Sequence, residues 1–239
     1  MDEKPLFTTS EIDDLNGQFE QAAPEELLRW SHETFGQDVA LGTGFGSSGV
    51  VLLHMVHTEN LPLTVFCLDT NLLFNETYAL WKQIEIRYGM SIESVAADLS
   101  LSEQAKIYGN TLWKTDPDTC CTIRKVKPLQ KYLSGKKAWI SGIRQSQSPQ
   151  RKEIRKVEWD PVNRVLKMNP LADWGDSMIW EVINKENIPY NPLYNEGYSS
   201  IGCAPCTNKA VSNGDGRAGR WSNFEKTECG IHLPVLNRS

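Results

Sequence analysis

The sequence predicts an α/β fold with a doubly wound, mostly parallel sheet and a mobile C-terminal tail. Short apolar runs that read as buried strands alternate with stretches of helical character. A glycine-rich turn separates the first of these runs from the helix expected after it. This alternation is typical of parallel strands joined by crossover helices, and such sheets bind ligands at the carboxyl ends of their strands.

Two short helices are expected before the first strand. Residues 10–21 form an acidic helical stretch, and a second helix starts at Pro24, where proline fits the first turn. Acids follow that proline near the positive end of the helix dipole. The apolar run 38–41 is then read as a strand and residues 42–48 as a loop, with a helix from Gly49 onward.

The loop after the first strand is the first candidate binding element. Its glycines allow a tight turn, and the N–H groups at the start of the following helix, with nearby hydroxyls, can hold a phosphate. A glycine-rich turn alone is a weak signal. The candidate residues are Thr43, Gly44, Gly46, Ser47 and Ser48.

The later elements repeat the same alternation. Strands are expected over 63–68, 91–95 and 138–142, helices over 75–88, 100–108 and 176–187, and a hairpin over 157–171. Three strand ends therefore converge on one crevice. Beyond the first loop they contribute Asp69, Thr70, Gly142 and Arg144, with Arg151 close behind; the planar forks of the two arginines suit phosphate or sulfate oxygens.

A linker-like stretch divides the chain. Residues 212–217 are rich in glycine and polar residues, so we expect an α/β domain over 1–211 and a flexible C-terminal segment over 212–239. Gly214, Gly216 and Gly219 are the candidate pivots of this segment.

The composition excludes several classes of protein. The chain has 239 residues, 40% of them hydrophobic, with no apolar run of membrane-spanning length, and its net charge of −5 argues against general nucleic-acid binding. Basic residues nevertheless gather between Arg124 and Arg155, so a local anion site is expected. Its cysteines and a start without an apolar signal segment lead us to expect a soluble protein of the reducing cytoplasm.

Five cysteines carry the strongest chemical signal. Four thiolates brought together by a fold suit tetrahedral zinc or an iron–sulfur cluster, and a fifth unpaired thiol beside a histidine suits covalent chemistry. Zinc ribbons usually repeat a Cys-x-x-Cys unit, whereas one half here is Cys-Cys, which favours a four-iron cluster and leaves zinc open. The residues are Cys120, Cys121, Cys203 and Cys206 for the metal site, and Cys229 with His232 for the chemistry.

Five motifs spread over nearly the whole chain carry a family resemblance. They are Cys120-Cys121-x-x-Arg124-Lys125, Gly142-x-Arg144-x-x-Gln147-Ser, Gly197-Tyr-x-Ser-Ile-Gly-Cys203-x-x-Cys206-Thr, Arg217-x-Gly-Arg220-Trp221 and Lys226-Thr-Glu-Cys229-Gly-Ile-His232. Together they resemble the assimilatory adenylylsulfate reductases, the iron–sulfur branch of the PAPS/APS reductase family. The resemblance implies an adenine nucleotide alpha hydrolase-like fold of the PP-loop type.

The resemblance also implies an activity. It is the reduction of adenosine 5′-phosphosulfate (APS) to sulfite and AMP in sulfate assimilation, through an S-sulfocysteine on Cys229. A [4Fe-4S] cluster is implied because the branch that uses the 3′-phosphorylated nucleotide (PAPS) typically lacks the four cysteines. Thioredoxin or a glutaredoxin-like dithiol is implied as the electron donor, and the family often forms homo-oligomers.

The residues make chemical sense of such a reaction. A thiolate approaches an anionic sulfo group only where positive charge offsets the repulsion, and the candidates are Lys125, Arg144, Arg151, Arg217 and Arg220. Lys125 lies one helical turn after Cys121, so we expect it to link the cluster to the substrate sulfate. His232 is expected either to stabilise or deprotonate the thiolate, or to contact the phosphate or solvent. Trp221 is expected to pack over the adenine or to anchor the tail.

Departures from the family pattern leave alternatives open. Asn71 stands where the family has glycine after the second strand, and asparagine tolerates the left-handed backbone. The phosphate loop lacks the acid that ATP pyrophosphatases use, which favours a substrate with one phosphate. The rival interpretations are a reductase of PAPS or of both nucleotides, an ATP-dependent PP-loop sulfur-transfer enzyme, and a non-catalytic iron–sulfur or zinc redox sensor.

Overall fold

The computed structural model describes residues 6–210, 217, 219–222 and 224–232. Its six-stranded sheet has the order β3-β2-β1-β4-β6-β5. Every neighbouring pair is parallel except β5 and β6, which form an antiparallel hairpin. The predicted doubly wound, mostly parallel sheet is therefore confirmed, and so is the hairpin.

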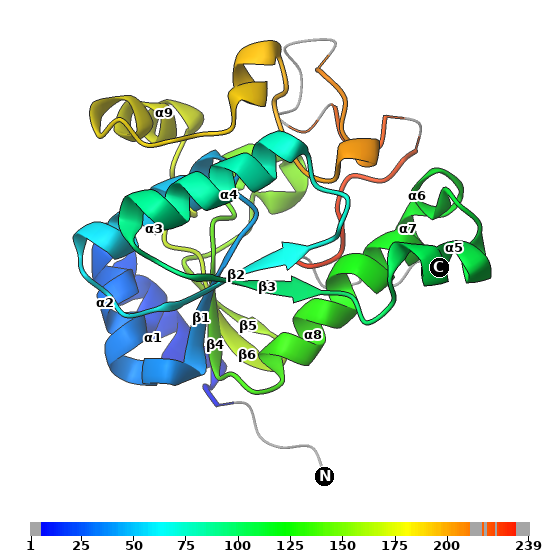
Figure 1. Cartoon of the computed structure of the whole chain (residues 1–239). Coiled ribbons are helices and arrows are strands. Elements are labelled where there is room, and N and C mark those ends of the chain that lie inside the picture. Colours follow the sequence, from blue (N-terminus) through cyan, green and yellow to red (C-terminus); the bar gives the residue numbers. More distant parts are fainter. Residues whose placement is uncertain (1–5, 211–216, 218, 223, 233–239) are drawn as a thin grey trace.

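Figure 1 shows how the helices surround this sheet. The strands are β1 (Val39–Thr43), β2 (Thr64–Asp69), β3 (Ile92–Ala96), β4 (Ala138–Ser141), β5 (Val157–Asp160) and β6 (Val165–Met168). The α-helices are α1 (Thr9–Phe19), α2 (Pro24–Phe35), α3 (Ser47–Thr58), α4 (Asn75–Tyr88), α5 (Leu101–Tyr108), α6 (Leu112–Thr115), α7 (Pro117–Cys121), α8 (Lys127–Leu133) and α9 (Asp176–Lys185).

The two faces of the sheet bury different sets of side chains. Val39 and Leu41 of β1 join the large core under α1, α2, α3, α4 and α9, whereas Ala40 between them points to the opposite face. There Leu129 and Leu133 of α8 complete a smaller core. This alternation is the strand period of two residues, and burial on both faces explains why the strands read as continuous apolar runs.

Local sequence signals set several of the helix ends. Thr8 and Ser100 each accept a hydrogen bond from the third backbone N–H of the following helix, and Glu11 and Glu103 complete both capping boxes. α3 begins at Ser47 rather than Gly49, so both serines of the glycine-rich loop lie in its first turn.

The segment from α7 to α8 is one helical stretch interrupted by a π-helical turn over Thr122–Val126. This turn carries Arg124 and Lys125 directly after the adjacent cysteine pair. Single π turns within α-helices frequently occur at functional sites.

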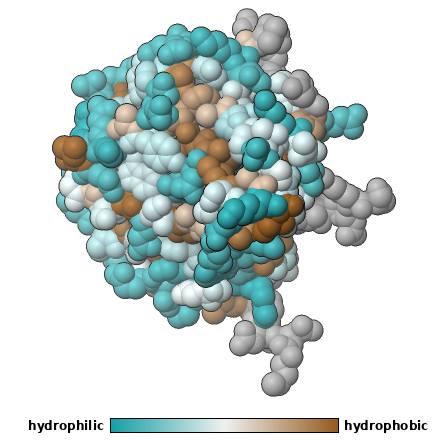
Figure 2. Space-filling model, turned by 45° about the vertical axis from the view of Figure 1, so that its right-hand side comes forward, coloured by the Kyte–Doolittle hydropathy of each residue, from teal (hydrophilic) through white to brown (hydrophobic). Residues whose placement is uncertain are grey.

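No helix in the described part of the chain is long and apolar enough to cross a membrane. Figure 2 shows apolar residues gathered in a strip on a face that is otherwise mostly hydrophilic.

Candidate active site

A cavity of about 620 Å³ lies at the carboxyl ends of β1, β2 and β4. Most of the residues predicted to bind or act on the substrate line this one cavity. They are Thr43, Gly44, Gly46, Ser47, Ser48, Lys125, Gly142, Arg144, Arg151, Arg217, Arg220, Cys229 and His232. The convergence predicted for the ends of β1 and β4 is therefore present, whereas β2 contributes Cys67 and Leu68 instead of the predicted Asp69 and Thr70. The C-terminal segment joins this space through Cys229.

The loop between β1 and α3 is tightly packed. Phe45 N–H donates to Thr43 Oγ1 at 3.1 Å, and a Cβ added to Gly49 would lie 2.7 Å from that same hydroxyl oxygen. Ser47 N–H, at the start of α3, donates to the hydroxyl of Tyr194 at 3.1 Å. Glycine at position 49 thus lets the N-terminus of α3 pack closely against the loop, and both border the cavity.

Arg144 has protein partners for its whole fork. Its Nε donates to Ser48 Oγ at 2.8 Å, one Nη donates to the Trp174 carbonyl oxygen at 2.9 Å, and the other pairs with Asp176. The side chain is 3% exposed. Arg144 therefore fixes the first turn of α3 against the loop after β4, and most of its N–H groups are bonded to protein atoms.

Arg151 is held in the same way, but by the C-terminal segment. Its Nε and one Nη donate to the two carboxylate oxygens of Glu228, each at 2.7 Å, and the other Nη donates to Gln147. Glu228 also pairs with Arg217 at 3.4 Å. The edge of Arg151 that was expected to bind phosphate or sulfate is thus filled by a carboxylate.

Three predicted substrate residues do not line the cavity. Asp69 accepts hydrogen bonds from Asn71 N–H at 2.9 Å and the Tyr78 hydroxyl at 2.7 Å. Thr70 is buried, with its hydroxyl 3.3 Å from the Cys203 sulfur. Asn71 adopts φ 56°, the left-handed conformation expected of it. Asp69 and Thr70 therefore shape the turn after β2, and Thr70 contacts the loop that carries Cys203.

Trp221 is the third residue outside the cavity. It is 3% exposed and packs with Cys121 and Cys229. The Arg220 guanidinium lies 4.5 Å from its ring centroid and the Lys226 ammonium 5.3 Å. Of the two expected roles, this packing matches anchoring of the tail.

The described part of the C-terminal segment lies against the domain. Trp221 N–H donates to the Cys206 carbonyl oxygen at 3.1 Å, and Lys226 pairs with Asp118 on α7. A Cβ added to Gly219 would overlap the Asn208 carbonyl oxygen, so this expected pivot is packed closely. The other two, Gly214 and Gly216, lie outside the described residues.

Cys229 is buried and lines the cavity together with Lys125. Burial raises the pKa of its thiol, but Lys125, the Ile231 N–H and Arg217 outweigh that effect, and the net pKa is lower than that of an ordinary cysteine. Burial lowers the pKa of Lys125, but Cys203, Cys229 and Cys121 together raise it by more. The pKa of Lys125 therefore lies above the usual lysine value. The site therefore favours a thiolate beside an ammonium.

His232 stacks on Trp139, with ring centroids 5.5 Å apart and an interplanar angle of 6°. Burial, and then the charges of Lys167, Arg151, Arg217 and Lys125, hold its pKa well below the usual value, so the ring is neutral at pH 7. Its carbonyl oxygen accepts a hydrogen bond from Lys167 Nζ at 3.1 Å.

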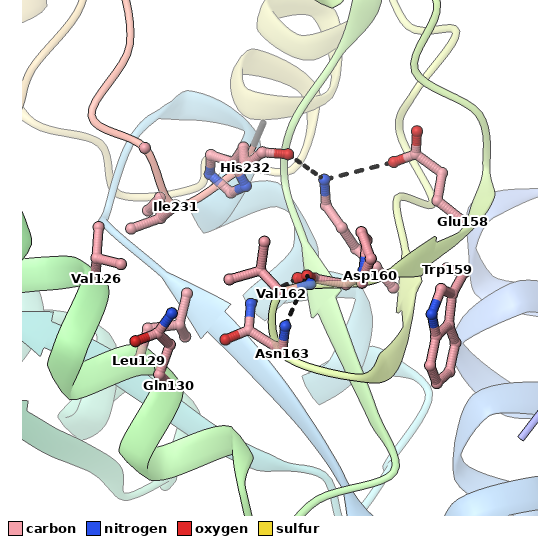
Figure 3. A pocket seen from close by; sticks show the side chains of 13 residues that line it. Val126, Leu129, Gln130, Glu158, Trp159, Asp160, Val162, Asn163, Ile231 and His232 are labelled. Atoms are coloured by element: carbon pink, nitrogen blue, oxygen red, sulfur yellow. Dashed lines mark hydrogen bonds and ion pairs between the residues drawn. The ribbon is translucent and has the colours of Figure 1, made fainter. Parts of the chain in front are cut away.

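Ile231 and His232 also border a second pocket of about 270 Å³. Figure 3 shows it between α8, which contributes Leu129 and Gln130, and the β5–β6 hairpin, which contributes Trp159. The end of the described chain thus separates the two pockets.

The four cysteines proposed as metal ligands are free thiols, three of them buried and Cys206 partly exposed. Cys120 and Cys121 end α7, and an isolated bridge between Leu73 and Cys203 fixes the second pair beside the end of β2. Burial, and then Cys203 and Cys206, raise the pKa of the Cys120 thiol to about 11. The charges of the two pairs therefore interact.

The surroundings fit an anionic cluster. Both Nη atoms of Arg124 are buried and have no hydrogen-bond partner among the described residues, and nearby Cys120 and Cys203 raise the pKa of this guanidinium against the larger effect of burial. Among the described residues, no three His, Cys, Asp or Glu side chains are grouped as ligands of a single ion. A four-iron cluster spaces its thiolates more widely, because each binds a different iron.

Sequence reasoning missed several contributors. Tyr194 borders the loop after β1, Gln104 holds Arg124, and Trp139 supports His232. Each lies in a segment without a motif of its own, so composition and spacing gave no signal. Glu228 stood inside the quoted C-terminal motif, but no role was inferred for it.

The fold and the site define an α/β domain with a buried cysteine thiol among cationic side chains in its cavity. Residues 38–209 match the model of the phosphoadenosine phosphosulfate reductase domain, and the chain belongs to this family.

Two relatives carry the name adenosine 5′-phosphosulfate reductase. The Salinibacter ruber protein is 44% identical over 228 residues, which cover 95% of this chain and 90% of the relative. Reductase 2 of Bacillus subtilis is 43% identical over 208 residues, covering 87% of this chain and 88% of the relative.

Two solved structures resemble this chain. Phosphoadenylyl-sulfate reductase from Candida auris, solved as a phosphate complex, is 29% identical with a TM-score of 0.76, covering 85% of this chain and 98% of its own. Candida glabrata FMN adenylyltransferase, at 16% identity and TM-score 0.56, covers 95% of this chain and 80% of its own and shares the fold alone.

Proposed function

We propose that this protein reduces APS to sulfite and AMP with electrons from an external dithiol, in sulfate assimilation. Family membership and the curated relatives named for this activity support the proposal. The observation that carries it is the placement of the buried Cys229 thiol beside Lys125, in the cavity that the loop after β1 also lines.

The first half-reaction forms a covalent intermediate. The nucleotide phosphate binds at the N-terminus of α3, which places the sulfo group toward Cys229. The Cys229 thiolate attacks the sulfur, the bond from sulfur to the phosphate oxygen breaks, and AMP leaves with that electron pair. Lys125, Arg217 and Arg220 line the cavity and offset the charge that gathers on the oxygens.

The second half-reaction releases sulfite. A thiolate of the dithiol attacks the Cys229 sulfur, and sulfite departs with the electron pair of the sulfur–sulfur bond. The second thiol of the donor then displaces Cys229, which returns as a thiolate. The donor supplies both electrons, and thioredoxin or a similar small dithiol protein fits this role.

We further propose that Cys120, Cys121, Cys203 and Cys206 hold a [4Fe-4S] cluster. When bound, it would supply a compact, charged group that links α7 to the loop carrying Cys203 and Cys206. The two unpartnered Nη groups of Arg124 support this assignment, because a cluster with its thiolates offers acceptors for them. Iron and sulfide analysis, together with a brown visible absorbance, distinguishes this cluster from zinc.

One anaerobic assay tests the activity. The protein is mixed with APS and reduced thioredoxin and sulfite is measured, with PAPS and ATP tested in parallel. Without reductant, mass spectrometry is expected to find one SO3 group on Cys229. Cys229→Ser is expected to bind AMP and keep the visible absorbance, but to release no sulfite. No sulfite from the parent protein would reject the proposal, and sulfite from PAPS alone would change the substrate.

A further inference from the structure

The carboxylate of Glu228 is unusual because it lies within a cluster of cations beside the nucleophile. Its two oxygens receive hydrogen bonds from Arg151 Nε and Nη2 at 2.7 Å each, and the two side chains are 10% and 5% exposed. Arg217 Nη2 lies 3.4 Å from the second oxygen. A bidentate, nearly buried pair of this kind fixes orientation as well as distance.

The pair joins parts of the chain that are far apart in sequence. Arg151 follows the loop after β4, 77 residues before Glu228, and Gln147 holds its remaining Nη. On the other side, Cys229 follows Glu228 directly, and Gly230 turns the backbone with φ 88°. That turn brings the Ile231 N–H to the Cys229 sulfur. Because Cys229 is the next residue after Glu228, the ion pair with Arg151 fixes the backbone directly beside the Cys229 thiol.

We propose that Glu228 is a positioning residue that docks the C-terminal segment on Arg151, so that Cys229 is held in the cavity for attack on the sulfo group. This inference rests on the function proposed above and adds a role for a residue which that mechanism does not use. Burial raises the pKa of Glu228, but the hydrogen bonds from Arg151 and the charge of Arg217 lower it by more. The net pKa is lowered, so the carboxylate is charged when the segment is docked.

The cations around Cys229 favour an ionised Glu228 side chain, which holds the C-terminal segment in place. Lys125, Arg151, Arg217 and Arg220 bring four cationic groups to the cavity lining. Removing the Glu228 carboxylate leaves the nearly buried charge of Arg151 without its main partner and among other cations, which is costly.

The same contact has to open in the second half-reaction. Cys229 is 9% exposed, so a dithiol protein cannot reach its sulfur while the segment is docked. Docking thus favours sulfonation and opposes reduction of the sulfonated cysteine. The two half-reactions are predicted to respond differently to a weaker Glu228–Arg151 pair.

The test uses the full-length, cluster-loaded protein and two variants. Glu228→Gln removes the charge and keeps the shape. Asp13→Asn removes the partner of Arg155 in an exposed ion pair on α1, away from the cavity, and serves as the matched control. Sulfonation is followed by mass spectrometry with APS and no reductant. Reduction is followed separately, by adding reduced thioredoxin to protein that is already sulfonated.

Glu228→Gln is expected to slow sulfonation by about tenfold to a hundredfold, as misplaced reacting groups do. Reduction of the sulfonated cysteine is expected to proceed at least as fast as in the parent. Visible absorbance and iron content stay unchanged, and Asp13→Asn behaves as the parent. Arg151→Gln combined with Glu228→Gln is expected to be little slower than the slower single variant, because both remove one contact.

A third readout does not depend on APS. Cys229 is alkylated with iodoacetamide and with a bulky maleimide, and the ratio of the two rates cancels any change in the thiolate fraction. Glu228→Gln is expected to raise the maleimide share. An unchanged ratio, or equal slowing of both half-reactions, overturns the docking role. A parent protein that forms no S-sulfocysteine refutes the proposed function, while the alkylation ratio still decides whether Glu228 docks the segment.

Discussion

Arg124 Nε donates to the Gln104 side-chain oxygen at 2.7 Å, while both Nη atoms of Arg124 are buried without a partner in the described part of the chain. A guanidinium fixed at one edge and unsatisfied at the other is costly unless acceptors are supplied to it. Burial lowers the pKa of Arg124, whereas Cys120 and Cys203 raise it, so this guanidinium lies close to members of the cysteine quartet.

Arg124→Met is therefore expected to weaken cluster retention. Loss of hydrogen bonds from a buried charged donor costs about 2 kcal/mol, so iron release to a chelator should become more than about tenfold faster. The measurement is the decay of visible absorbance under anaerobic chelation. Arg155→Met, which loses only an exposed pair with Asp13, is the control. Equal decay in both variants would contradict the assignment.

Lys125 is expected to act on the rate of sulfonation. Because its ammonium faces both Cys229 and the cavity, Lys125→Ala should lower that rate by about a hundredfold to a thousandfold, the usual loss when one preorganised cation or donor is removed. Single-turnover mass spectrometry measures this rate. Lys127→Ala, exposed in the next turn, should leave it unchanged. Unchanged sulfonation in Lys125→Ala with the cluster intact would remove Lys125 from the mechanism.

Gly202 is expected to control the placement of Arg220. A Cβ added there would overlap the Arg220 guanidinium, so Gly202→Ala should displace it from the cavity wall. Losing one charged contact is expected to weaken AMP binding by about tenfold. Titration calorimetry measures the affinity. Gly135→Ala meets no atom within 4 Å and should bind as the parent does.

His232 is expected to make stability depend on pH. Its folded pKa lies below the unfolded value of 6.5, so the unfolded chain binds more protons below that pH. The packing of His232 contributes fully above about pH 6.5, and its contribution is lost as the pH falls toward the folded pKa. Thermal unfolding from about pH 8 to 5 should show a shallower decline for His232→Phe than for the parent. Parallel curves would show that His232 is not held neutral.

The sequence predicted the sheet well because buried parallel strands are continuous apolar runs, and β1, β2 and β4 each stand out as one. The convergence of Thr43, Gly142 and Cys229 also followed from strand ends and motifs. The stretch from α6 to α8 could not be read, because its helices are short and a π turn shifts their faces.

The partners of the arginines were equally hidden. Arg151 and Glu228 are separated by 77 residues, and Arg144 and Asp176 by 32, so no local pattern links either pair. Both arginines were expected to offer their forks to a ligand, whereas the structure gives both forks protein partners. The Glu228 carboxylate takes that of Arg151, and Arg144 bonds to Ser48, the Trp174 carbonyl oxygen and Asp176. Only the packing of loops and tail against the sheet decides between these uses.

The enclosure of Trp221 gives the molecule an internal optical reporter. Its indole packs with Cys121 and Cys229. Three cations lie 4.5 to 5.7 Å from its ring centroid, those of Arg220, Lys226 and Arg217. Indole emission responds to nearby charge and to solvent, so undocking of the C-terminal segment will shift the fluorescence of this one of the eight tryptophans. Comparison of the parent with Trp221→Phe isolates that signal and turns each catalytic cycle into an observable change in light.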